Sequence, residues 1–94
     1  MNLRITRRAQ NDLESLFAYI AADNPFAAQR VIERILAALE RLRGHPGLGH
    51  AGRVSGTREL VVRHTPYIAV FLARPDEIVI VRIRHGSRAW PPAR

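Results

Sequence analysis

The pattern of hydrophobic and polar positions predicts that the chain begins with a short strand that runs into a helix. Residues 2–5 alternate between polar and apolar side chains, which is typical of a strand with one buried face. In residues 7–22 apolar side chains recur at helical spacing, and they are Ala9, Leu13, Leu16, Phe17 and Ile20. Thr6 precedes this stripe, and its hydroxyl is suited to cap the helix.

A second helix is predicted directly after the first. Asp23 and Asn24 offer a capping side chain, and Pro25 fits the first helical position because its missing N–H costs nothing there. An apolar stripe follows at helical spacing: Ala28, Val31, Ile32, Ile35, Leu36, Leu39 and Leu42. Arginines close to the end suit the negative pole of the helix dipole, and Gly44 is expected just past the last turn. The two helices form a hairpin with a very short link.

The rest of the chain predicts a loop and three strands. Residues 44–56 hold five Gly, one Pro and two His, which indicates an irregular, flexible connector. Runs rich in Val and Ile follow at residues 57–63, 66–72 and 77–85, and they should form an antiparallel meander. The order β-α-α-β-β-β predicts an α+β fold, with a helical hairpin packed on a small antiparallel sheet. A length of 94 residues fits a single domain over residues 1–94.

Composition and spacing exclude several classes of chemistry. The chain has no cysteine, and no apolar run approaches the ~20 residues of a membrane span, so we expect a soluble, cytoplasmic protein without a membrane partner. Residues 47–52 read G-x-G-x-x-G, but they follow a helix and precede a strand, whereas a dinucleotide site needs the opposite order. The four histidines have no metal-ligand spacing. We therefore expect no cofactor and no metal.

The charge of the chain favours acidic partners. Fifteen basic residues, all arginine, stand against eight acidic ones, which gives a net charge of +7. Such a field attracts polyanions and acidic proteins, and the arginine fork makes bidentate contacts with phosphate or carboxylate. The exclusive use of arginine has two explanations, binding of phosphate or carboxylate groups and the codon usage of a GC-rich genome. Codon usage is the favoured one.

A cluster of arginines near the end of the chain is the main candidate site. In the strand of residues 77–85, Arg82 and Arg84 should point to one face of the sheet, opposite Val79, Val81 and Ile83. The meander should also bring four residues near one another: Arg63, Arg84, His85 and Arg88. Residues 78–94 contain no Asp or Glu, which favours a binding surface over an ordinary solvated face. Trp90 can stack on a base or pack at the core edge, and the prolines after it favour packing.

Six short segments carry a family resemblance along nearly the whole chain. They are residues 8–14 (RAQNDLE), 24–28 (NPFAA), 45–49 (HPGLG), 58–62 (RELVV), 66–71 (PYIAVF) and 83–91 (IRHGSRAWP). In this order they resemble the RelE/ParE superfamily of type II toxin-antitoxin toxins, and the closing HGSRAWP is most similar to the ParE-like end. The resemblance implies a cytoplasmic growth inhibitor, held in a hetero-oligomer by an acidic antitoxin.

The resemblance also implies two alternative targets. ParE-like members inhibit DNA gyrase, whereas RelE-like members cut mRNA on the ribosome. In RelE-like members basic residues contact the RNA at positions that match Arg53, Arg63 and Arg88 here. This chain lacks the paired lysines of that pattern in the loop before the meander, and it lacks the tyrosine near the C-terminus. These departures favour the gyrase-directed branch.

We therefore expect a gyrase inhibitor, with a ribosome-dependent mRNA interferase as the alternative and a module that binds only its antitoxin as a third possibility. RNA cleavage needs a base, an acid and cations around the phosphate, and His85 is the only side chain in or after the last strand that titrates near neutrality. A gyrase inhibitor needs only a protein-binding surface, and it need not be an enzyme. The predicted target-binding residues are Arg53, Arg63, Arg82, Arg84, His85, Arg88 and Trp90. Four of them should matter for toxicity rather than for folding: Arg63, Arg84, His85 and Arg88. For the interferase, the catalytic residues would be Arg63, His85 and Arg88.

Overall fold

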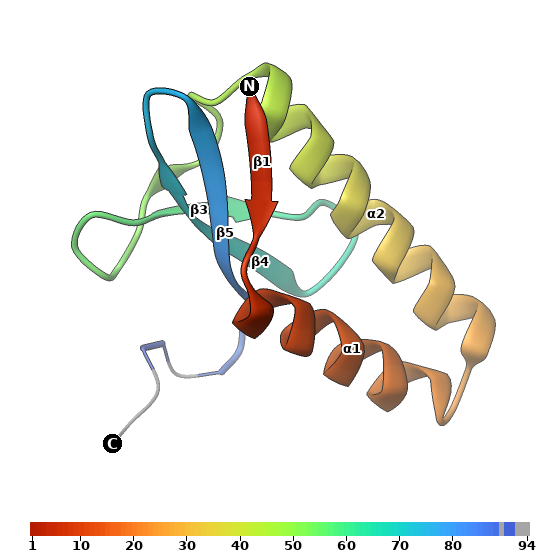
Figure 1. Ribbon diagram of the computed structural model, residues 1–94. Coiled ribbons are helices and arrows are strands. Elements are labelled where there is room, and N and C mark those ends of the chain that lie inside the picture. Colours follow the sequence, from red (N-terminus) through yellow and green to blue (C-terminus); the bar gives the residue numbers. More distant parts are fainter. Residues whose placement is uncertain (89, 92–94) are drawn as a thin grey trace.

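The helical hairpin forms where the sequence predicts it. The computed structural model describes residues 1–88 and 90–91, and it contains helix α1 (Arg7–Ala21) and helix α2 (Pro25–Gly44) (Figure 1). Thr6 Oγ accepts a hydrogen bond from the Ala9 N–H at 3.2 Å, and Asn24 Oδ1 accepts one from Ala27 at 3.1 Å, so both predicted caps are confirmed. Gly44 is the last residue of α2 rather than the residue after it. In the described part of the chain, no helix is long and apolar enough to cross a membrane.

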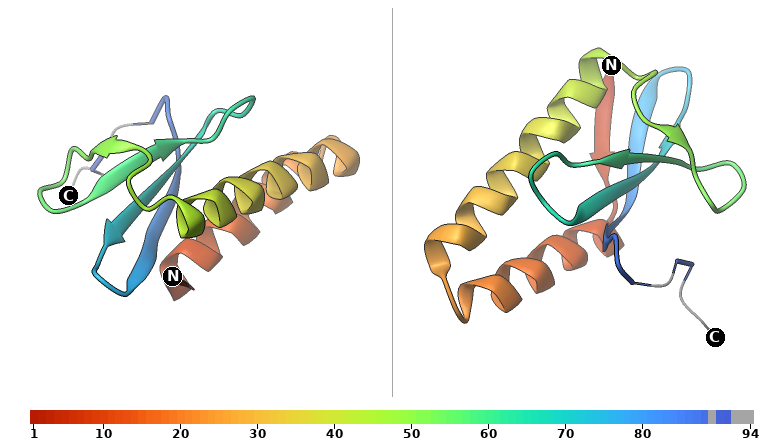
Figure 2. Two further views of the ribbon diagram at one scale, coloured as in Figure 1. Left: turned by 90° about the horizontal axis from the view of Figure 1, so that it is seen from above. Right: turned by 180° about the vertical axis from the view of Figure 1, so that it is seen from behind.

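The sheet has five strands and confirms the α+β fold. In chain order they are β1 (Asn2–Ile5), β2 (His50–Ala51), β3 (Arg58–Val61), β4 (Tyr67–Ala73) and β5 (Glu77–His85). Their order across the sheet is β1-β5-β4-β3-β2, and the helices lie on one face of it (Figure 2). The last three strands form the predicted antiparallel meander, but β1 pairs with β5 in parallel. The sheet is therefore mixed, because the helical hairpin leads the chain away from β1 and the last strand returns beside it.

The glycine-rich segment before the meander is joined to β3 although most of its residues are exposed, and it contains a short strand, which corrects the prediction of a wholly irregular connector. It contains β2, which pairs with β3, and the Arg58 guanidinium donates to the carbonyls of Gly47, Leu48 and Gly49. Gly49 has a φ of +87°, and a Cβ there would lie 2.5 Å from the Glu59 carbonyl oxygen. Gly49, the second glycine of the G-x-G-x-x-G pattern, thus allows this loop to approach β3 closely.

The hydrophobic core lies between the hairpin and the sheet. Ile35, Leu39 and Leu42 of α2 are almost fully buried against Phe71 of β4 and the isoleucines of β5. Burial of each such side chain contributes about 1.5–3 kcal/mol relative to leaving it exposed. This core fixes the position of α1 over β5, where the candidate site lies.

A bulge in β5 changes which side chains face the core. Val70 pairs with Arg82 and Phe71 pairs with Ile80, so Val81 has no partner on β4. Arg82 and Arg84 lie on the same face of β5, as predicted, and at the edge of the sheet the Arg82 side chain reaches Asp12 of α1. Ile83 faces the core together with Ile80, whereas Val79 lies on the arginine side. The predicted placement of Val79 opposite the arginines is therefore wrong, because the extra residue at the bulge shifts the alternation.

Candidate functional site

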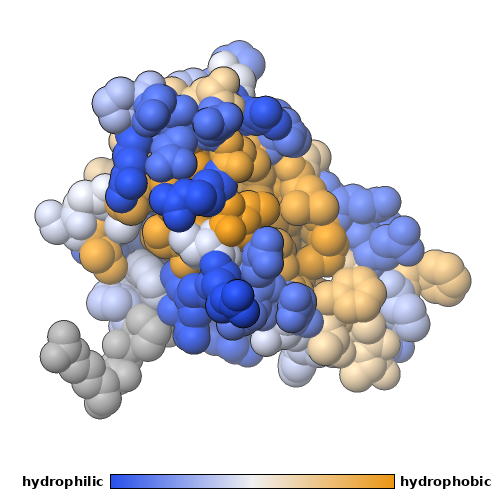
Figure 3. Space-filling model, in the orientation of Figure 1, coloured by the Kyte–Doolittle hydropathy of each residue, from blue (hydrophilic) through white to orange (hydrophobic). Residues whose placement is uncertain are grey.

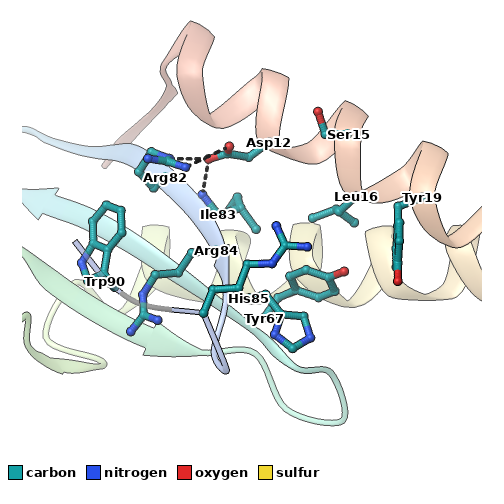
Figure 4. A pocket seen from close by; sticks show the side chains of 11 residues that line it. Asp12, Ser15, Leu16, Tyr19, Tyr67, Arg82, Ile83, Arg84, His85 and Trp90 are labelled. Atoms are coloured by element: carbon teal, nitrogen blue, oxygen red, sulfur yellow. Dashed lines mark hydrogen bonds and ion pairs between the residues drawn. The ribbon is translucent and has the colours of Figure 1, made fainter. Parts of the chain in front are cut away.

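A cleft of about 460 Å³ opens between α1 and the C-terminal end of β5 (Figure 4). Four residues of α1 line one wall: Asp12, Ser15, Leu16 and Tyr19. The other wall comes from β4, β5 and the residues after β5: Tyr67, Arg82, Ile83, Arg84, His85, Arg88 and Trp90. The cleft thus collects five of the seven residues that the sequence predicts for target binding.

Asp12 ties α1 to the open edge of β5. Its carboxylate accepts a hydrogen bond from Arg82 Nε at 2.8 Å and one from the backbone N–H of Ile83 at 2.9 Å (Figure 4). The pairing of β1 with β5 ends at Ile80, so Asp12 supplies an acceptor where the neighbouring strand stops. The charge of Arg82 is therefore largely balanced inside the cleft wall.

Arg84 is buried in an ion pair with Glu59, which corrects the prediction that it acts in toxicity alone. Its Nη2 lies 3.0 Å from Glu59 Oε1, and the two side chains are only 6% and 3% exposed. Burial raises the pKa of Glu59, but hydrogen bonds from the Arg53 N–H and from Arg84, together with the charges of Arg84 and His50, outweigh it and hold the pKa below its ordinary value. Arg84 consequently belongs to the folded scaffold of the site.

Trp90 packs over the two paired arginines. The guanidinium carbons of Arg82 and Arg84 lie 5.2 Å and 5.7 Å from the centre of the Trp90 ring, within the range of cation–π attraction. The ring is half-buried, which agrees with the packing role that the sequence favours. The tryptophan thereby covers part of the positive face.

His85 and Tyr67 form an aromatic pair at the other end of the cleft. They are partners across β4 and β5, and their rings meet edge to face with centroids 5.4 Å apart. His85 Nδ1 accepts a hydrogen bond from the Ser87 N–H at 3.1 Å and lies 2.7 Å from Ser87 Oγ. Burial raises the pKa of the Tyr67 hydroxyl, the charge of Arg88 opposes the rise, and Tyr19 adds to it. The cleft therefore contains two tyrosines that the sequence analysis did not single out.

Two predicted site residues lie elsewhere. Arg63 follows β3 in a turn and lines a separate groove against α2, so it does not join Arg84, His85 and Arg88 as expected. The reason is that β3 ends at Val61 and the next residues turn towards the helix. Arg53 is exposed in the loop between β2 and β3, where its backbone N–H donates to Glu59.

Within the described chain, no three His, Asp or Glu side chains are placed to hold a metal ion. Among the residues that line the cleft, Arg88 is the one arginine without a carboxylate partner. The cleft is therefore less basic than the sequence suggests, and its walls include three large aromatic side chains, Tyr19, Tyr67 and Trp90. Such a surface is typical of the buried centre of a protein–protein interface.

Comparisons with known proteins agree with this fold. The toxin homologue Y4kP of Sinorhizobium fredii is 39% identical over 95% of this chain and 92% of its own length. Toxin RelE3 of Caulobacter vibrioides is 38% identical over 84% of this chain and 87% of its own. A solved structure of the chromosomal ParDE toxin-antitoxin system from P. aeruginosa superposes with a TM-score of 0.80 at 30% identity, covering 90% of this chain and 95% of that one.

The family described as "ParE toxin of type II toxin-antitoxin system, parDE" matches residues 3–90, which include both helices, every residue of the cleft and all of the strand residues except Asn2. The chain therefore belongs to the ParE family of type II toxin-antitoxin toxins.

Proposed function

We propose that this toxin arrests growth by inhibiting DNA gyrase, and that the cleft between α1 and β5 is the surface that binds gyrase. The observation that carries the proposal is the internal pairing of the arginines. Asp12 neutralises Arg82 and Glu59 neutralises Arg84, so among the described residues the cleft keeps one arginine without a carboxylate partner, and its walls include Tyr19, Tyr67 and Trp90. Aromatic side chains with one or two arginines are the usual anchors of protein interfaces.

The same geometry argues against RNA cleavage. Stabilising a phosphate in the transition state calls for several cations aimed at it, but two of the three arginines here point to carboxylates. An acid or base also works best when its pKa lies near the operating pH. Burial moves the pKa of Tyr67 upward from 10.0 and so further from neutrality, and one ring nitrogen of His85 already bonds Ser87. The tyrosine beside His85 therefore does not complete an acid–base pair.

Two assays on the purified toxin separate the alternatives. We expect it to block supercoiling of relaxed plasmid by gyrase, and we expect no new mRNA ends in a translating extract. Cuts in translated mRNA, with supercoiling unaffected, would assign the protein to the interferase alternative. An absence of both activities, together with tight antitoxin binding, would leave a module that binds only its antitoxin.

A protein antitoxin is the second partner, as the match to a ParDE system supports. We infer that an amphipathic segment of it covers the apolar surface that gathers over β1 and between β1 and the helices (Figure 3). Half-buried Ile5 and Ile32 and exposed Phe17 and Leu36, which are 41% and 43% accessible, are apolar residues of β1 and the helices that we expect to contact this segment. Leu36→Glu should therefore weaken binding of the antitoxin encoded beside the toxin, whereas Glu33→Gln on the same helix should not.

A further inference from the structure

A second hollow, which the proposed function does not use, lies between α2 and the turn after β3. Figure 2 shows this turn beside the helix when the molecule is seen from behind. The hollow has a volume of about 410 Å³, and we call it the α2 groove. Basic residues form its rim: Arg34, Arg41, Arg63 and His64. Small apolar residues complete the lining: Ala37, Ala38 and Val62. The α2 groove shares no lining residue with the cleft, so its role is separable from that of the cleft.

The positive charge of the arginines that line the α2 groove is not neutralised by any acidic residue of the lining. No carboxylate belongs to its lining, in contrast to the cleft, where Asp12 lies beside Arg82. Arg34 donates to the carbonyl oxygen of His64 at 3.2 Å, which holds the turn against the helix. His64 itself has a φ of +64°, a conformation that a residue with a side chain adopts rarely, and the Thr65 N–H and hydroxyl both donate to the carbonyl oxygen of Val62, which closes the turn. The groove is thus a formed basic site with an apolar floor.

The spacing of the rim arginines sets the length of a ligand. Arg34 and Arg41 are seven residues apart on α2, which places them about 10.5 Å apart along the helix axis. In an extended peptide of polyproline II conformation, which has three residues per turn and rises about 3.1 Å per residue, residues i and i+3 lie on the same side and about 9 Å apart. Two carboxylates three residues apart on an extended chain would therefore reach both arginines, with a small apolar side chain between them on the floor of Ala38 and Val62.

We propose that the α2 groove binds an extended acidic segment of the antitoxin, with two carboxylates three residues apart around small apolar residues. This proposal rests on the proposed function only in taking the antitoxin as the partner. An acidic segment would meet no like charge in the groove, because its lining has no carboxylate. The lining also has no aromatic ring on which a base would stack, which favours a peptide over a single-stranded nucleic acid.

The proposal gives Arg63 a different role from the one that the sequence suggested. Arg63 adds a third guanidinium opposite the two on α2, and with His64 it closes the other side of the groove. Long-range attraction by such a cluster speeds association with an acidic segment, and its effect falls as salt rises. Binding at the groove should therefore depend on ionic strength more strongly than binding at the apolar surface over β1.

A peptide titration followed by backbone amide NMR tests the chemistry of the groove directly. The probe is a blocked peptide of sequence AEAVEA, compared with AQAVQA, with AEEAVA and with a thymidine hexanucleotide. We expect AEAVEA to shift the amides of Ala37, Ala38 and Val62 at millimolar concentration, and the other three ligands to shift them at least about fivefold more weakly. Equal shifts from AEEAVA, stronger shifts from the oligonucleotide or shifts confined to the cleft would overturn the proposal.

A pair of double variants tests the role of the groove in the complex. R34Q/R41Q removes two charges from the rim, and R7Q/R8Q removes two charges from exposed positions at the start of α1, outside both the groove and the cleft. We expect R34Q/R41Q to bind the antitoxin encoded beside the toxin at least about tenfold more weakly than the wild type, and R7Q/R8Q to lose less than about threefold. Thermal unfolding of both variants controls for folding.

The readouts keep this proposal apart from the proposed function. Equal affinities for the two double variants would reject the α2 groove as an antitoxin site, whatever the toxin inhibits. A selective loss of antitoxin affinity in R34Q/R41Q would support the groove even if the toxin left gyrase untouched. Supercoiling inhibition by R34Q/R41Q should equal that of the wild type, because neither residue lines the cleft.

Discussion

Asp12 and Arg82 join the first helix to the last strand through a contact of 2.8 Å between Oδ2 and Nε. The same carboxylate oxygen accepts a hydrogen bond from the backbone N–H of Ile83. One side chain therefore both neutralises Arg82 and bonds the backbone of β5 beyond the end of β1. The residues that follow in β5 include His85, which lines the cleft. Asp12 therefore acts on the cleft by positioning the strand that supplies one of its walls.

Asp12→Asn should destabilise the protein by about 1–3 kcal/mol, because it removes a charge from a mostly buried pair and weakens two hydrogen bonds. Urea denaturation followed by circular dichroism measures this loss. Glu14→Gln is the matched control, since Glu14 is exposed on the same helix and has no ion pair in the described structure. Equal stabilities for the two variants would show that the Asp12 contact contributes nothing.

The arrangement of helices and meander strands was predictable from the sequence because it depends on local signals. The stripe that includes Leu13 and Leu16, the cap at Asn24 and the Val- and Ile-rich runs each specify their own element. The parallel pairing of β1 with β5 joins residues more than seventy positions apart, and no local pattern encodes it. The bulge at Val81 could not be predicted from the sequence either, because the extra residue is defined only by the pairing register of β5 with β4.

Removal of Arg84 should destabilise the fold strongly. Arg84→Ala leaves the Glu59 carboxylate buried without its partner, and the expected loss is about 3–5 kcal/mol. Arg88→Ala removes the same charge from an exposed position and should change the denaturation midpoint little. If Arg84→Ala unfolded at the wild-type midpoint, the buried pair would have no structural role.

The lowered pKa of Glu59 predicts a loss of stability in acid. Because the folded state holds the Glu59 proton less tightly than the unfolded state, the stabilisation is present above the ordinary pKa of 4.5 and disappears as the pH falls through the lower folded value. Glu59→Gln should therefore be less stable than the wild type at neutral pH, and this difference should shrink below pH 4.5. Denaturation curves from neutral pH into this range test the prediction, and a constant difference would contradict it.

The cleft was only partly predictable because its composition depends on tertiary contacts. The sequence identified the basic residues of β5 and of the residues after it, because these arginines lie close together in the sequence with no Asp or Glu among them. It missed the carboxylates that neutralise them, because Asp12 and Glu59 lie seventy and twenty-five residues away in the chain. Tyr67 was missed for the same reason, although its place opposite His85 follows once the register of β4 and β5 is known.

The raised pKa of Tyr67 predicts a late step in the alkaline titration of the protein. The folded state keeps the Tyr67 proton longer than the unfolded state, so its stabilisation is present below pH 10.0 and is lost as the pH rises through the folded value. The ultraviolet absorbance of tyrosinate should show a transition above pH 10.0 that Tyr67→Phe abolishes. Arg88→Ala should move that transition to still higher pH, because the charge of Arg88 lowers the pKa of Tyr67. A transition that Arg88→Ala leaves in place would show that the two residues are not close in solution.

Substitutions at His85 and Arg88 discriminate between the two mechanisms of growth arrest. His85→Gln keeps the polarity and approximate size of the side chain but removes proton transfer near neutral pH. A surface that binds gyrase needs no proton transfer, so this variant should keep most of its supercoiling inhibition and its toxicity.

Arg88→Ala should weaken inhibition by roughly tenfold, because Arg88 is the arginine of the cleft that no carboxylate of the described residues already engages. Growth curves after induction without antitoxin and supercoiling assays on purified variants measure both effects. Site-specific cleavage of translated mRNA that disappears in His85→Gln would instead make His85 a catalytic residue and the protein an mRNA interferase.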